Sequence, residues 1–470
     1  MNYIHTEANG QMVFSQERCT FLMIPSSLDG FNNADTTTEI SKSGRNVYCF
    51  NGTLDDDMDR TCGHCGSKMH VNNHLNVELR HLGFGGALSV VRFRKLQLRC
   101  PKCGSTILQE VPFKAEHHRI TQDLYTYTRD LLALGNYTNR QVAQITGLDE
   151  NIVKTIDKRR LQEKYTIDGK ELIQPEQPAR ILGIDEFKLH NGYRFATHII
   201  DMDTGHILWI SYGKKKQVVY DFIEHVGLEW MDNVEAVACD MNSDFQEAFE
   251  EKCPHIQPVF DHFHIVKNFN EKVIAEVRKD EQKRLQEEGD EAAAKSLKRT
   301  KYILTSSRKT LQRKDKEASE GKVISRGNAL FNKEEIRRKG GYVEKYEELL
   351  KQNQLLFMVD LIKEKLADAY RMVDEPAMAG SVIEIIDLCR STRNDHFKWF
   401  ANLIENHFEG IIAHATYQIT SGKVEGINNK IKTLRRQGYG YPDDEYFFLK
   451  LFDASRKSYV RNIPSHKILE

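Results

Sequence analysis

Three acidic residues stand where their carboxylates could share metal ions. Asp185 follows the apolar run Ile-Leu-Gly-Ile at 181–184, which is too short for a helix and is typical of a buried strand. Asp240 follows a second apolar run, and Glu425 lies in the stretch Ser-Gly-Lys-Val-Glu-Gly-Ile-Asn-Asn-Lys-Ile-Lys. Carboxylates that converge without a cation repel each other, and a divalent metal removes that conflict. Oxygen ligands favour Mg²⁺ or Mn²⁺, and two such ions about 4 Å apart can activate a water and stabilise the leaving oxygen of a phosphodiester.

The stretch around Glu425 predicts a helix with one polar face. Ser421 is the expected N-cap. The residues at spacings i, i+3, i+4 and i+7 are Glu425, Asn428, Asn429 and Lys432. We expect the carboxylate to bind metal and the amides and lysine to bind DNA, with added positive potential from Lys430, Arg435 and Arg436. An exposed charged helix is the alternative, and Glu384 and Glu405 are rival third carboxylates that lack such neighbours.

The elements between 178 and 270 must bring Asp185 and Asp240 together. Three strand-like segments come first, with a turn at 203–205 between the second and third, and a helix, the strand ending at Asp240, a second helix and a strand ending at Asp261 and His264 follow. This is the order of a ribonuclease H-like core, in which the first and fourth strands are neighbours. Their carboxyl ends would set Asp185 beside Asp240. Asp261 and His264 are candidate supporting residues of this site: a histidine near the metals would either position water or phosphate or satisfy a buried hydrogen bond.

Two Cys-x-x-Cys pairs are separated by a strand-rich insert at 66–99. Each pair offers two thiolates, and four thiolates complete the tetrahedral shell of a structural zinc ion. The predicted zinc ligands are Cys62, Cys65, Cys100 and Cys103. A fortuitous pair of motifs is the alternative, and the nearby histidines are less favoured ligands. Four cysteines leave no open position, so the sequence predicts a zinc ribbon and no catalytic zinc.

Residues 120–163 have helical apolar spacing. One helix ends at Gly135, and two shorter helices, with Thr138 and Asp149 as N-caps, are broken at Gly147. This is the spacing of a helix-turn-helix, with 151–160 as the candidate recognition helix. Its predicted DNA-binding residues are Lys154, Lys158, Arg159 and Arg160. A helical linker bundle without a DNA contact is the alternative.

Composition excludes several classes of protein. The 470 residues are 40% hydrophobic and 29% charged, as in an ordinary folded protein. No apolar run approaches the roughly 20 residues that span a bilayer, and the N-terminus lacks a secretory pattern, so we expect a cytoplasmic protein with no membrane partner. The net charge of −1 hides local basic clusters, including one at 298–313 that could bind DNA or brace the core.

The sequence as a whole predicts a multidomain α+β protein. From about 265 to 408 the chain is charge-rich with helical spacing, which indicates an all-helical insertion. The predicted parts are an N-terminal region with the zinc ribbon at 1–113, a helix-turn-helix at 117–165, the first part of the core at 178–270, the insertion at 271–415 and the final part of the core at 416–470.

This order of motifs resembles the bacterial DDE transposases of the ISL-three insertion-sequence family. The resemblance lies in Leu-Gly-Ile-Asp-Glu-Phe around Asp185, Ala-Cys-Asp ending at Asp240, Asp-His-Phe-His from 261 to 264, and the Glu425 stretch through Lys432. It implies that Asp185, Asp240 and Glu425 hold two Mg²⁺ or Mn²⁺ ions. Water attack at the element's end would free a 3′-hydroxyl, which then attacks target DNA.

The resemblance also implies partners. Lys432 would hold the terminal DNA, and the ribbon and helix-turn-helix would recognise the terminal inverted repeats. A homodimer or higher oligomer on DNA is expected, because two element ends must be cut. The protein would be bacterial and would associate with the nucleoid when it is bound to DNA. Two alternatives stay open: a DNA-binding repressor whose core has lost catalysis, and a ribonuclease H-like nuclease that cuts without joining strands.

Overall fold

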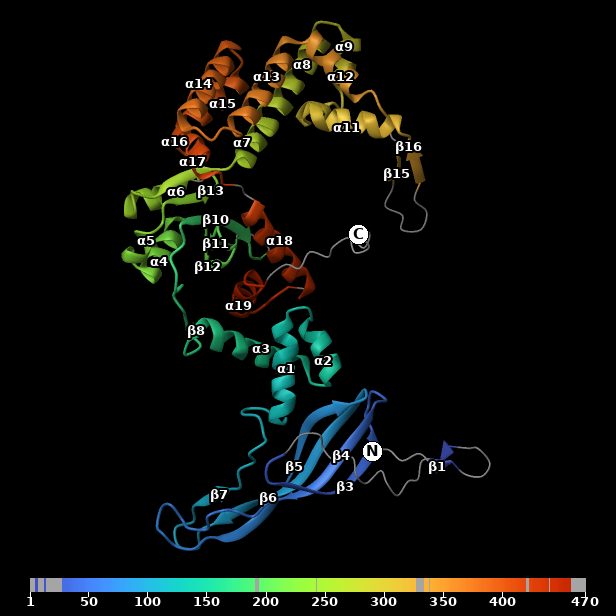
Figure 1. Ribbon diagram of the computed structural model, residues 1–470, viewed down its shortest axis with the longest axis vertical. Coiled ribbons are helices and arrows are strands. Elements are labelled where there is room, and N and C mark those ends of the chain that lie inside the picture. Colours follow the sequence, from blue (N-terminus) through green and yellow to red (C-terminus); the bar gives the residue numbers. More distant parts are fainter. Residues whose placement is uncertain are drawn as a thin grey trace. The chain divides into compact units, whose positions relative to one another are not determined.

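The computed structural model describes residues 5–6, 12–13, 28–190, 194–241, 243–326, 334–337, 339–419, 422–438 and 440–457. The chain forms two compact units (Figure 1). The first comprises Met1–Ile173 and Arg435–Lys450, and the second comprises Gln174–Leu434 and Leu451–Glu470. Among the helices of the described residues, none combines the length and the apolar character needed to cross a bilayer.

A twisted sheet dominates the beginning of the first unit. Its strands are β3 (Phe31–Ile40), β4 (Asn46–Leu54), β5 (His70–Phe84), β6 (Ala87–Arg99) and β7 (Thr106–Leu108). The order is β3-β4-β6-β5, with β7 on β6, and the long β5–β6 hairpin occupies the insert between the two cysteine pairs (Figure 1). Phe50, Leu79 and Val91 form its apolar core. A separate short pair joins β1 (His5–Thr6) to β2 (Met12–Val13).

Three helices follow in the same unit. They are α1 (Gln122–Leu134), α2 (Asn139–Thr146) and α3 (Glu150–Tyr165), followed by the short pair β8 (Thr166–Ile167) and β9 (Glu171–Leu172). The predicted helix limits are confirmed: Thr138 forms a capping box, Asp149 caps α3, and Gly135 and Gly147 end their helices with positive φ. Buried Leu124, Val142 and Val153 pack the helices together.

The second unit holds a mixed five-stranded sheet. Its strands are β10 (Ile181–Lys188), β11 (Phe195–Asp201), β12 (Ile207–Tyr212), β13 (Ala236–Cys239) and β14 (Gln257–Phe260), in the order β12-β11-β10-β13-β14. The predicted pairing of the first and fourth strands is confirmed, since β10 runs parallel to β13. The connecting helices are α4 (Lys216–Val226), α5 (Leu228–Met231) and α6 (Ser243–Lys252).

Two strand limits were predicted wrongly. The first core strand was expected to end at Asp185, but β10 continues through Asp185 to Lys188. The strand expected to end at His264 ends at Phe260, and helix α7 (His262–Asn268) carries His264. Asp261 occupies the N-cap position with an extended backbone, so the chain turns directly from strand to helix.

The insertion is helical, with one exception. Its further helices are η2 (Phe269–Ile274), α8 (Ala275–Glu287), α9 (Glu291–Leu297), α10 (Lys301–Thr305), α11 (Arg308–Ser319), α12 (Tyr342–Gln352), α13 (Gln354–Ala369), α14 (Glu375–Ser391), α15 (Asp395–Asn406), α16 (Phe408–Ile412) and α17 (His414–Tyr417). The expectation of an all-helical insertion was wrong, because β15 (Val323–Arg326) pairs with β16 (Glu334–Arg337). β-Branched residues such as Val323 and Ile336 favour strands there.

Two helices complete the chain, α18 (Gly422–Gln437) and α19 (Asp444–Ser455). The first thirteen residues of α18 belong to the second unit, and residues 435–450 belong to the first. The predicted N-cap of α18, Ser421, lies outside the described residues.

Candidate functional site

Asp185 and Asp240 lie on two neighbouring parallel strands, Asp185 within β10 and Asp240 directly after the end of β13. Gly183 of β10 pairs with Ala238 of β13, and each aspartate lies two residues further along the chain. The strand register therefore brings the two aspartates close together. Burial is the main cause that raises the pKa of Asp185, and the charge of Asp240 raises it further.

Helix α18 packs closely on β10. A Cβ atom on Gly183 would come within 2.6 Å of Met202 Sδ and 3.1 Å of Val424 Cγ2, so only glycine leaves room for the helix. The Lys423 ammonium group donates to the backbone carbonyl of Asp203 at 2.6 Å and to that of Met202. These contacts hold the first turn of α18 against the sheet.

Asn428 connects that helix to Asp185. The Asn428 Nδ2 atom donates to Asp185 Oδ2 at 2.6 Å, and the Glu186 backbone N–H donates to Asp185 Oδ1 at 2.8 Å. Glu425 lies three residues before Asn428 and therefore on the same helix face. Its exposed side chain makes no direct polar contact with the described residues.

The electrostatics of this site favour a cation. Burial raises the pKa of Asp185, and the hydrogen bonds from Asn428 and Glu186 offset this rise only in part. Burial also raises the pKa of Glu186, and the charges of Asp185 and Asp240 raise it further. The Asn428 Oδ1 atom is buried without a protein partner among the described residues. An oxygen-rich site with mutually repelling carboxylates fits a hard divalent cation such as Mg²⁺ or Mn²⁺.

The two supporting residues differ in position. His264 Nδ1 lies 3.1 Å from Asp240 Oδ1, and both side chains are partly exposed. The Asp261 Oδ2 atom is buried and unpartnered among the described atoms. The structure therefore brings His264 to the carboxylate pair through Asp240.

The other predicted residues of α18 are distributed along its length. Asn429 and Lys432 are exposed, whereas Lys430 donates to the carbonyl of Ala454 at 3.4 Å. Arg435 is half-buried, and Arg436 is exposed. The rival carboxylates lie on insertion helices, where Glu384 pairs with Lys365 at 2.7 Å and Glu405 pairs with Arg390 at 2.6 Å.

The four cysteines form one cluster. The ligand atoms of Cys62, Cys65, Cys100 and Cys103 lie within 4.8 Å of one another. The two pairs have matching turns, in which the N–H groups of Gly66 and Gly104 donate to the carbonyls of Cys62 and Cys100. The Ser105 hydroxyl is the main cause that lowers the pKa of Cys62 to about 6. Four thiols gathered around one point are compatible with a structural zinc ion.

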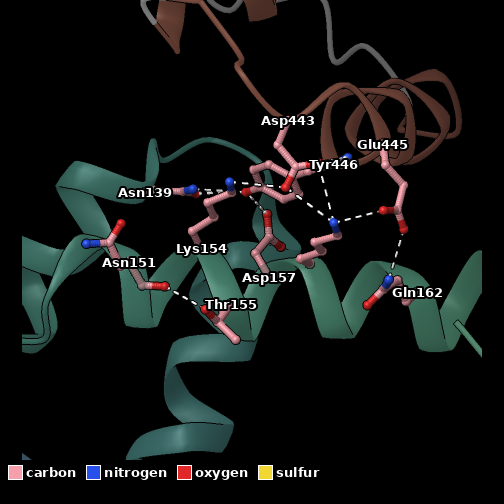
Figure 2. Close-up of polar contacts among 10 residues, drawn as sticks. Asn139, Asn151, Lys154, Thr155, Asp157, Gln162, Asp443, Glu445 and Tyr446 are labelled. Carbon is pink, nitrogen blue, oxygen red and sulfur yellow. Dashed lines mark hydrogen bonds and ion pairs between the residues drawn. The ribbon is translucent and has the colours of Figure 1, made fainter.

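The four basic residues of α3 that were predicted to bind DNA contact acidic groups of the same unit, and Figure 2 shows Lys154 beside Asp443. Lys154 lies 3.1 Å from Asp443, and Lys158 lies 3.3 Å from Asp443 and 2.9 Å from Glu445. Arg159 pairs with Glu116 and Glu163, and Arg160 pairs with Asp157. A DNA contact through these four residues remains a prediction.

Sequence reasoning missed several residues of these sites. Glu186 is visible beside Asp185 as an acidic pair, but a strand alternates its faces, so adjacency gave no reason to assign it to the site. Asp443 and Glu445 form an acidic run in the sequence, yet their lysine partners lie 285 and 287 positions away. Only the folded chain shows these pairs.

The sequence that forms this α+β fold is similar to the transposases of insertion sequences. The family model DDE_Tnp_ISL3, described as Transposase, matches residues 182–451, and the chain belongs to this family. It is 27% identical over 392 residues to the transposase for insertion sequence element IS1001 of Bordetella parapertussis, which covers 83% of this chain and 87% of the relative. It is 23% identical over 385 residues to the transposase for IS1557 of Mycobacterium tuberculosis, which covers 81% and 82%.

Proposed function

We propose that the chain binds the terminal inverted repeats of an insertion sequence and catalyses metal-dependent DNA cleavage and strand transfer. The main support is the geometry around Asp185 on β10. The strand register brings Asp185 beside Asp240, and Asp185 accepts a hydrogen bond from Asn428 on the helix that carries Glu425. The strand order β12-β11-β10-β13-β14, with helices between the parallel strands, supports a ribonuclease H-like core.

Each residue of this site has a proposed role. Asp185, Asp240 and Glu425 would hold two Mg²⁺ or Mn²⁺ ions. When bound, these ions would activate the attacking hydroxyl and stabilise the leaving oxygen of the phosphodiester. Asn428 fixes the orientation of the Asp185 carboxylate, and His264 does the same for Asp240. Lys432 and Asn429, with Lys430, Arg435 and Arg436 as the basic surroundings, would contact DNA.

The first unit would supply recognition. Helices α1 to α3 are proposed to form a helix-turn-helix DNA-binding domain, because α2 and α3 are separated by a short turn at Gly147. The four-cysteine cluster would bind structural zinc in a ribbon next to it. We keep the domain limits proposed from the sequence, except that residues 435–450 pack with the first unit. The protein would assemble as a dimer or higher oligomer on DNA in the bacterial cytoplasm.

A cleavage and strand-transfer assay tests this function. The substrate is a duplex that carries the element's inverted repeat, with Mg²⁺ or Mn²⁺ present. Asp185→Asn and Glu425→Gln should lose both reactions while repeat binding persists. Cleavage by these variants at the wild-type rate would show that the proposed metal site is wrong. Binding without cleavage by the wild type would favour a repressor, and cleavage without joining would favour a nuclease.

A further inference from the structure

Two lysines of α3, Lys154 and Lys158, contact carboxylates that the fold holds in place. Lys154 and Lys158 share Asp443, and Lys158 also contacts Glu445 (Figure 2). Burial alone would raise the pKa of Asp443, but hydrogen bonds from the Tyr446 N–H and from both lysines lower it. A DNA phosphate that approached either lysine would also approach these two carboxylates, and like charges at close range disfavour that contact.

A buried network holds the acidic segment in place. Asp157 of α3 is fully buried and accepts hydrogen bonds from Tyr446 Oη at 2.7 Å and Lys450 Nζ at 2.8 Å. Asn139 of α2 donates to the same Tyr446 hydroxyl at 2.9 Å. Breaking a buried ion pair by removing one partner costs several kcal/mol, about 3–5. Residues 443–450 are therefore part of the three-helix packing and do not detach easily from α3.

Asn151 and Thr155 form a polar strip on α3 beside Lys154 and Lys158. At 3.6 residues per turn, Asn151 and Thr155 fall between the row of Lys154 and Lys158 on one side and Arg159 on the other. Both side chains are exposed. Within the described part of the chain the side-chain amide of Asn151 has no protein partner. The Thr155 hydroxyl donates to the Asn151 backbone carbonyl at 2.8 Å, which leaves its oxygen lone pairs without a hydrogen-bond partner among the described residues.

We propose that Asn151 and Thr155 determine sequence specificity by contacting base edges, and that Lys154 and Lys158 hold the 443–450 segment and do not bind phosphate. This inference rests on the proposed function, in which α3 is the recognition helix. An asparagine amide can bond both N6 and N7 of adenine in the major groove, and a threonine methyl group can contact the methyl group of thymine. The residues at the start of a recognition helix are those that reach base edges.

Equilibrium binding to two DNA duplexes tests this assignment in the full-length protein. One duplex carries the element's terminal inverted repeat, and the other has the same composition in scrambled order. Fluorescence anisotropy at several salt concentrations gives both the preference for the repeat and the salt slope. The variants are Asn151→Ala, Thr155→Ala and the double variant Lys154→Gln with Lys158→Gln, each checked by thermal unfolding.

Asn151→Ala should weaken binding to the repeat duplex about 5- to 100-fold. Its affinity for the scrambled duplex, the salt dependence of its binding and its unfolding temperature should stay as in the wild type. Thr155→Ala should reduce the preference by a smaller factor. The lysine variant should keep the wild-type salt slope, whereas two lost phosphate contacts would reduce it by about two. An intact preference in Asn151→Ala, or a reduced salt slope in the lysine variant, would overturn the proposal.

The wild-type protein separates this proposal from the proposed function. If the wild type binds both duplexes equally, recognition of the repeat fails, and the specificity assignment fails with it. If the wild type prefers the repeat and Asn151→Ala keeps that preference, only the assignment fails.

Discussion

Asn428 and Asp185 lie 243 positions apart in the sequence, yet the Asn428 amide donates a 2.6 Å hydrogen bond to the Asp185 carboxylate. A helix from the end of the chain is thus attached to the first strand of the core sheet. Because Glu425 lies one turn before Asn428, this bond also fixes the helix face on which the third proposed metal ligand stands.

Loss of this hydrogen bond should reduce DNA cleavage. Hydrogen bonds to charged groups contribute about 1.5–3 kcal/mol, so Asn428→Ala should lower the cleavage rate about 10- to 100-fold with little change in repeat binding. Thr433→Ala, an exposed position further along α18, is the control and should cleave normally. Equal rates for both variants would rule out a positioning role for Asn428.

A side chain larger than that of glycine at position 183 should destabilise the second unit, because the space there is already filled. In Gly183→Ala the new Cβ meets Met202 Sδ at 2.6 Å and Ile200 Cγ1 at 3.0 Å, and such overpacking destabilises by about 1–3 kcal/mol. Gly426→Ala is the matched control, since nothing lies within 4 Å of its Cβ and alanine stabilises a helix by up to about 1 kcal/mol. Urea unfolding should give changes of opposite sign. An undiminished stability in Gly183→Ala would refute the close packing of α18 on β10.

His198 should make the fold sensitive to acid. It lies opposite Asp185 on β11, is fully buried, and its two ring nitrogens have no partner among the described residues. Burial lowers its pKa from 6.5 to about 4, so the neutral ring is favoured in the folded state. The contribution of the neutral His198 ring to the free energy of unfolding is fully present above pH 6.5 and is lost as the pH falls towards 4. The free energy of unfolding should fall by about 3 kcal/mol at most.

His198→Leu removes this titration. Urea unfolding at pH 7 and pH 4.5 should show a smaller loss of stability in the variant than in the wild type. The same loss in both proteins would mean that other groups cause the acid sensitivity.

The cysteine cluster should bind zinc. Cys62→Ser should remove the bound zinc and lower the unfolding temperature of the first unit, because binding of a structural zinc ion contributes directly to folding. Cys389→Ser is the control, since Cys389 is buried outside the cluster. Metal analysis of purified protein measures the zinc content. Full zinc content in Cys62→Ser would show that the four thiols are not its ligands.

The core could be predicted because local signals decide it. The strand and helix order around Asp185 and Asp240 follows from apolar runs and turns, and the confirmed pairing of β10 with β13 follows from that order. His264 was placed on a strand because the apolar pattern of β14 continues into α7, whereas the change of backbone at Asp261 leaves no trace in that pattern.

The contacts of polar side chains could not be predicted in the same way. Lys154 and Lys158 form a basic cluster in sequence, and only the fold brings Asp443 and Glu445 to them. The amide of Asn428 was assigned to DNA because its carboxylate partner is remote in sequence. Charge patterns indicate which residues need partners, but the fold decides which partner each one has.

Manganese binding tests the shared metal site most directly. Isothermal titration calorimetry measures the affinity for Mn²⁺ of the wild type and of three variants, Asp185→Asn, Glu425→Gln and Glu405→Gln. Glu425 is the proposed ligand on α18, and Glu405 is the control carboxylate on the insertion. Asp185→Asn and Glu425→Gln should each weaken Mn²⁺ binding at least about tenfold, and Glu405→Gln should bind as the wild type does. If Glu425→Gln binds Mn²⁺ as tightly as the wild type, Glu425 does not share a metal site with Asp185 and Asp240.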